Sequence, residues 1–206
     1  MGTVAKSRAG NDFKPVPSGT HIAVCTAVVD LGLQKGSEMY PKPKEQIYLR
    51  WEIPAETVTW KDSDGNEKSG PAVIGKTYTL SLSERARLRS DLESWRGRSF
   101  TDAELIGFDV KNVLGKGCQL GVVHNESGGK TYANIAAVMG LPKGVASPAP
   151  SGDLLYYSVD APNQAIYEKL PQWLREKIDG RIPPVKKEAI EHGGEDFDDD
   201  VSDLPF

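Results

Sequence analysis

Apolar and polar residues alternate cleanly from position 46 to position 53, and this period of two predicts a half-buried β-strand. One phase of the strand consists of Ile47, Leu49, Trp51 and Ile53, and the other consists of Tyr48, Arg50 and Glu52. Successive side chains of a strand point to opposite faces, so one phase packs in a core and the other faces outward. We expect the phase with Trp51 to form the core side; the reverse orientation is the alternative.

Shorter patterns of the same kind predict the remaining strands at residues 21–31, 56–60, 72–82, 117–124 and 130–139. The last four pair into two hairpins, because each pair is separated by a run of turn-forming residues, at 62–66 and at 125–129. Most of the predicted body is therefore β-structure.

One predicted helix lies between the predicted strands. Residues 83–98 predict an amphipathic helix that Ser83 can cap, with apolar positions Leu88, Leu92 and Trp95. After a connector, residues 108–114 fit either a strand or a second helix. The sequence leaves these two possibilities open.

A second helical pattern follows a linker rich in proline and glycine. Residues 163–178 predict one or two short helices, because Pro171 either breaks the first or opens the second. Their apolar positions are Ile166, Leu170, Trp173, Leu174 and Ile178. We expect this unit to pack onto the body or onto another subunit.

These elements predict an all-β core, an OB-fold-like partly open barrel with one inserted helix, C-terminal short helices and a disordered acidic tail. The expected divisions are a flexible arm at 1–18, the barrel at 19–141, a linker at 142–152, a helical appendage at 153–182 and the tail at 183–206.

Charge divides the chain unevenly. The formal net charge is −4, yet residues 188–206 hold eight acids and no lysine or arginine. Setting these eight acids aside leaves 25 basic against 21 acidic residues, so the body carries about +4. A basic body with an acidic appendage favours a nucleic-acid binder that also docks to other proteins.

Several classes of protein are disfavoured by the sequence. No run of 18 apolar residues is present and the first 12 residues are polar, so we expect a cytoplasmic protein without a membrane span or signal peptide. Cys25 and Cys118 lie far apart in apolar strands and are expected to be buried thiols. The three histidines show no ligand or triad spacing, so we expect no enzyme activity, no metal and no cofactor.

The last 11 residues combine acidity with an apolar tip. The predicted partner-docking residues are Asp196, Phe197, Asp198, Asp199, Asp200, Asp203, Leu204, Pro205 and Phe206. Aspartates steer such a peptide to a basic surface, and the terminal ring and carboxylate suit an apolar pocket next to a cation.

This tip resembles the C-terminal tip of bacterial single-stranded DNA-binding proteins, in which an Asp-rich run ends in Pro-Phe; here Val201–Asp203 is an insertion. The layout of the body is similar to the phage-encoded single-stranded DNA-binding proteins. The resemblance implies a barrel that covers single-stranded DNA, a tail that recruits replication or recombination enzymes, and the cytoplasm of a bacterial host.

Single strands are bound by aromatic faces that stack on bases and by cations that follow the phosphates. Residues of both types cluster on the predicted outward strand face, in the loop before it, at the first hairpin and on the closing hairpin. The predicted DNA-binding residues are Lys35, Tyr40, Lys42, Lys44, Tyr48, Arg50, Trp60, Lys61, Lys68, Lys130 and Tyr132.

The predicted function is therefore binding of single-stranded DNA without sequence preference. A homodimer is one oligomeric state that the sequence allows. The alternative is a protein-interaction module or DNA mimic that captures host replication enzymes without binding DNA. The body charge of about +4 argues against a mimic.

Overall fold

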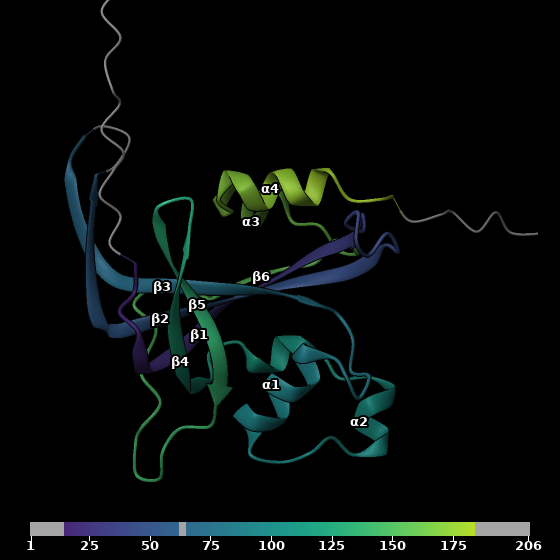
Figure 1. Cartoon of the computed structure of the whole chain (residues 1–206), viewed down its shortest axis with the longest axis horizontal. Helices are drawn as coiled ribbons and strands as arrows, with labels where there is room; N and C mark the ends of the chain where they lie inside the picture. The colour runs from purple at the N-terminus through teal and green to yellow at the C-terminus, as the bar shows by residue number, and fades with distance from the viewer. Residues whose placement is uncertain (1–14, 62–64, 184–206) are drawn as a thin grey trace, which may run out of the picture.

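Five long strands form one curled antiparallel sheet in a computed structural model that describes residues 15–61 and 65–183 (Figure 1). The strands are β1 (Gly19–Gln34), β2 (Lys44–Lys61), β3 (Glu67–Thr79), β4 (Gly117–Ser127) and β5 (Lys130–Met139). Their order in the sheet is β3-β2-β1-β4-β5. This curled sheet of antiparallel strands confirms the predicted OB-fold-like partly open barrel.

The strand phase predicted for residues 46–53 is confirmed. Leu49 and Trp51 are fully buried in the main apolar core, whereas Tyr48 and Arg50 lie on the other face of β2. The alternative with Trp51 outward is wrong. β2 is also longer than predicted, because a register irregularity between Ile53 and Thr57 lets one strand continue through both predicted segments.

The helical segment between β3 and β4 comprises α1 (Arg87–Arg96), α2 (Asp102–Ile106) and the 3-10 turn η1 (Val110–Val113). Ser83 does not cap α1, because residues 83–86 first form a turn in which the Ala86 amide donates to the Ser83 carbonyl. The strand predicted as one possibility for residues 108–114 is absent from this described segment, which forms η1 instead.

α1 closes the seam of the barrel between β3 and β5, the two ends of the sheet. Its Asp91 is only 5% exposed and accepts hydrogen bonds from Lys76 Nζ (2.8 Å) and Tyr78 Oη (2.9 Å) on β3. Arg87 lies 3.0 Å from the same carboxylate and also donates to the Ala136 carbonyl on β5. An ionic network centred on the buried Asp91 thus connects α1 to both end strands.

The C-terminal appendage covers the outward face of β1. It consists of β6 (Leu155–Tyr157), α3 (Gln164–Lys169) and α4 (Gln172–Asp179), and β6 pairs with β1 in parallel. A second apolar cluster joins β1 to the helices through Ala27, Val29, Leu31, Leu170, Leu174 and Ile178. The predicted split at Pro171 and packing onto the body are confirmed, whereas β6 was not predicted.

Other predictions concern the linker, the cysteines and the ends of the chain. The linker contacts the sheet, where Ser151 donates through N and Oγ to Glu52 (2.9 and 2.7 Å). Cys25 and Cys118 are buried free thiols, as predicted. Of the predicted arm at 1–18, residues 1–14 lie outside the described residues, while Val16 is buried in the main core. The predicted tail lies outside the described residues from residue 184 onward. Within the described part of the chain, no helix is long and apolar enough to cross a membrane.

Candidate nucleic-acid interface

The outward face of β2 is partly occupied by the appendage. Tyr48 is half-buried, and its ring meets Trp173 of α4 edge-on at 5.0 Å between centroids. Burial raises the pKa of the Tyr48 phenol, and the nearby Arg50 charge opposes this shift. Arg50 is also half-buried and donates from Nε to Thr26 Oγ1 (3.2 Å). The structure therefore brings Tyr48 and Arg50 together but gives the tyrosine a partner within the chain.

The β1–β2 loop carries the second group of predicted residues. Lys35, Tyr40, Lys42 and Lys44 are all exposed, and Tyr40 retains 64% of its accessible surface. Lys44 Nζ lies 5.5 Å from the centroid of the Tyr40 ring, within the range of a cation–π contact. This loop presents an aromatic face next to several cations, which is the pairing that single-strand binding requires.

The distal β2–β3 hairpin (residues 57–61 and 67–71) carries the third group. Trp60 is 47% exposed, pairs across the strands with Lys68, and has its ring over Gly70. Val58, two residues before Trp60, packs against the main core, so the Trp60 face of the hairpin continues the core side of the sheet. Trp60 and Lys68 thus lie on the other face from Tyr48 and Arg50. The side chain of Lys61, also predicted to bind DNA, lies outside the described part of the structure.

The closing β4–β5 hairpin carries the last pair. Tyr132 is 50% exposed and lies opposite Asn125, and Lys130 lies opposite Ser127 beside the turn. Val123, also half-exposed, is a diagonal neighbour of Tyr132 on the same face. This hairpin therefore presents an apolar and aromatic surface with one cation at its tip.

The predicted groups do not form one compact site. The β1–β2 loop and the distal hairpin lie at opposite ends of β2, with Tyr48 and Arg50 between them. The distal hairpin, the β4–β5 hairpin and the α3–α4 pair all project toward the top of the view in Figure 1. The candidate residues are therefore spread along β2 and over both of its faces, an arrangement that suits a polymer better than a small ligand.

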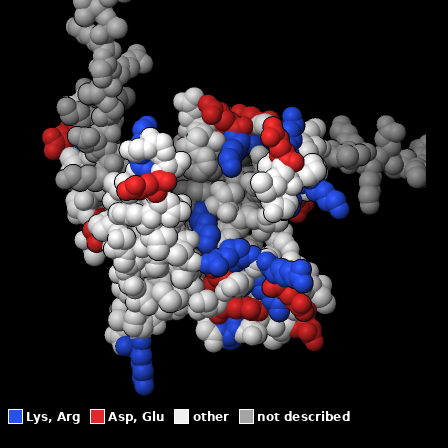
Figure 2. Space-filling view, in the orientation of Figure 1, with Lys and Arg blue, Asp and Glu red and all other residues white. Residues whose placement is uncertain are grey.

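The positive charge on the face shown in Figure 2 is only partly available to a ligand, because some of its basic residues are paired with carboxylates. Figure 2 shows a group of Lys and Arg side chains near the middle of this face, between the sheet and α1. Two arginines of α1 are held by carboxylates, Arg87 by Asp91 at 3.0 Å and Arg89 by Glu93 at 3.1 Å. These arginines stabilise the helix and the seam, so they are weaker candidates for phosphate contacts than the loop lysines.

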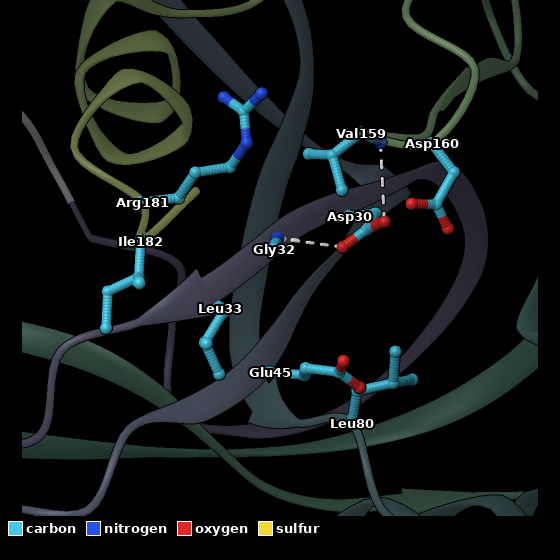
Figure 3. A pocket seen from close by; sticks show the side chains of 9 residues that line it. All are labelled: Asp30, Gly32, Leu33, Glu45, Leu80, Val159, Asp160, Arg181 and Ile182. Atoms are coloured by element: carbon cyan, nitrogen blue, oxygen red, sulfur yellow. Dashed lines mark hydrogen bonds between the residues drawn. The ribbon is translucent and has the colours of Figure 1, made fainter. Parts of the chain in front are cut away.

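A cavity of about 230 Å³ lies where the appendage meets the β1–β2 loop (Figure 3). Asp30 anchors it, accepting from the amides of Gly32 (2.8 Å) and Val159 (3.3 Å). Asp160 and Glu45 add two further carboxylates to its lining, against the single cation Arg181. This acidic cavity disfavours phosphate, so it marks an edge of the candidate interface rather than a part of it.

Trp173 is an exposed aromatic residue, although its spacing in the sequence predicts only a position on an apolar helix face. The apolar stripe of the appendage is complete with Leu170, Leu174 and Ile178, which recur every four residues. Trp173 lies about 100° from Leu174 around the helix, off this stripe. That offset was the available signal that the ring would be partly exposed.

The described residues offer little for metal chemistry. Within residues 15–61 and 65–183, no group of three or more His, Cys, Asp or Glu side chains is arranged to hold a metal ion. His124 contacts the Val16 carbonyl through Nε2 (2.7 Å), which ties the start of the described chain to β4.

No protein-family model matches this sequence, and no curated protein matches it.

Proposed function

We propose that this protein binds single-stranded DNA without sequence preference and acts in DNA replication, recombination or repair. The observation that carries the proposal is the combination of an OB-fold-like sheet with exposed aromatic and basic residues along β2 and its adjoining loops. OB-folds bind oligonucleotides through the sheet face formed by the second and third strands and through the loops after the first and fourth strands. Stacking accepts any base, so such a surface needs no sequence preference.

The loop lysines are proposed to follow the phosphates. Lys35, Lys42 and Lys44 are exposed, and each phosphate contact to a single strand releases counterions. Affinity should therefore fall with salt, at a logarithmic slope of about −0.7 per contacted phosphate.

A titration of labelled oligo-dT, followed by fluorescence anisotropy at about 50 and 200 mM salt, tests the proposal. We expect tight, salt-dependent binding, weakened by the double substitution Lys42→Glu/Lys44→Glu. Lys143→Glu is the control, because Lys143 is also exposed but lies on the linker. Absence of binding at the lower salt, or equal losses in both variants, would contradict the proposal.

The acidic segment Asp196–Phe206 is proposed to recruit replication or recombination enzymes. Because its charge also competes with DNA for basic residues, its deletion should leave the affinity for oligo-dT equal or higher. A clear loss of affinity in the truncated protein would contradict this role and would make the segment part of the DNA-binding surface.

The second candidate is a protein-interaction module that binds no DNA. The observation that favours it is the concentration of eight acids in residues 188–206. The same titration separates the two functions, because this candidate predicts no salt-dependent binding even after the acidic segment is removed.

A further inference from the structure

Trp173 is the exposed aromatic residue of the appendage, with 43% of its surface accessible. α4 does not need this ring for its own packing, because Leu174 and Ile178 are almost fully buried against β1. A large aromatic side chain that remains half-exposed after its helix has packed is available to a ligand.

The position of the Trp173 ring is well defined. Its helix is anchored through Leu174 and Ile178, and the helix end is tied to the body by the Ile182 amide, which donates to the Leu33 carbonyl (2.7 Å). The edge-on contact with Tyr48 fixes the ring itself from the side of the sheet. A ring held in this way loses little conformational freedom when a base stacks on it.

The surroundings of the ring match a nucleic acid. Tyr48 reaches across to β3, where Gly75 lies under its hydroxyl; a Cβ at position 75 would overlap that oxygen. Arg50 lies two residues after Tyr48 on the same face of β2, so its guanidinium group is on the same side of the sheet as the two rings. Within the described residues Arg50 makes no ion pair, and its side chain donates only to Thr26. An aromatic face beside an available cation fits a base with its phosphate.

We infer that Trp173 stacks on a base of bound single-stranded DNA, and that α4 with Tyr48 and Arg50 forms part of the DNA-binding surface. This inference rests on the proposed function and adds to it a stacking residue, Trp173, that lies outside the barrel strands and loops. The appendage then serves the ligand directly, in addition to covering β1.

Intrinsic fluorescence can isolate this ring. The chain has four tryptophans, of which Trp51 and Trp95 are buried and Trp60 and Trp173 are half-exposed. In the variant Trp60→Phe, Trp173 is the remaining exposed tryptophan, so we expect oligo-dT to quench its emission. The double variant Trp60→Phe/Trp173→Phe should lose this quenching while still binding labelled oligo-dT.

Affinity provides the second measurement. Trp173→Ala should weaken binding of oligo-dT by roughly 5- to 150-fold, the range expected for loss of one base–aromatic stack, whereas Trp173→Phe should retain most of the affinity. Gln172→Ala is the control, because Gln172 is an exposed neighbour on α4. Thermal unfolding of each variant shows whether the appendage stays packed.

The possible failures are distinguishable. If the unsubstituted protein does not bind oligo-dT, the proposed function fails. If it binds, but Trp60→Phe shows no quenching and Trp173→Ala binds with unchanged affinity, only the assignment of Trp173 is overturned. An equal loss for Gln172→Ala and Trp173→Ala would also overturn it, because the effect would then come from the helix and not from the ring.

Discussion

Asparagine in place of Asp91 should open the seam of the barrel. The side chain keeps its shape but loses its charge, and its amide group must face either Arg87 or the Lys76 and Tyr78 pair, all of which are donors. Burial and the Asp91 carboxylate both raise the pKa of the Tyr78 phenol, so this hydroxyl remains a donor throughout the working pH range. At least one buried donor is therefore left without an acceptor.

Removing one partner of a buried ion pair typically destabilises a protein by about 3–5 kcal/mol. The lower end of this range applies to Asp91→Asn, because the Arg87 side chain is 56% exposed and can be hydrated when its partner is lost. The Lys76 side chain is only 21% exposed and largely cannot be hydrated. A loss of about 3 kcal/mol is a large part of a typical stability of 5–15 kcal/mol. It corresponds to a fall in Tm of about 6–12 °C for a domain of this size.

Urea and thermal denaturation followed by circular dichroism measure the effect. Lys169→Ala is the control, because Lys169 and Asp153 form an exposed ion pair at 3.7 Å, which contributes less than about 1 kcal/mol. If Asp91→Asn costs no more than this control, the network does not hold β3 and β5 together and the explanation of the closed seam is wrong.

Three further predictions concern pH, packing and reactivity. The Arg98 guanidinium, followed by the Thr101 amide, lowers the pKa of Glu104 to about 2. Glu104 therefore stabilises the fold fully above its unfolded pKa of about 4.3 and loses this effect as the pH falls toward 2. Urea midpoints of Glu104→Gln and the parent should differ at neutral pH and converge in acid; a constant difference would count against this pair. Leu174→Ala should cost about 2–5 kcal/mol and speed proteolysis of the appendage, and unchanged cleavage would show that Leu174 does not anchor it. Burial raises the pKa of the Cys25 thiol to about 12 and that of Cys118 in the same direction, so a thiol reagent at mildly alkaline pH should react only after unfolding; fast reaction of the native protein would contradict their burial.

The local alternation of residues was sufficient to predict the central part of the sheet. The period of two from residue 46 to 53 placed Trp51 in the core and Tyr48 outward, and both placements are confirmed. This worked because the pairing of β2 with β3 is regular from Gln46 to Ile53, and the irregularities in the pairing with β1 add residues to β1 alone, so side-chain direction in β2 follows directly from residue number.

Other placements depended on distant contacts that a sequence pattern does not contain. The irregularity between Ile53 and Thr57 adds residues to β2 alone, so alternation counted from Trp51 cannot give the face of Trp60. β6 is only three residues long and is stabilised by a strand far earlier in the chain, which leaves no local signal. Trp173 is different, because a helix that begins after Pro171 already places this residue about 100° from Leu174, off the apolar stripe.

The sharing of β1 between the sheet and the appendage has a consequence for biosynthesis. β1 is among the first elements to leave the ribosome, but its outward residues Ala27, Val29 and Leu31 are covered only by segments that lie beyond residue 154. Its native surroundings are therefore completed only when nearly all of the described chain has been translated. A nascent or prematurely terminated chain would expose these apolar residues of β1. We expect chaperones to bind this strand until α4 has emerged from the ribosome.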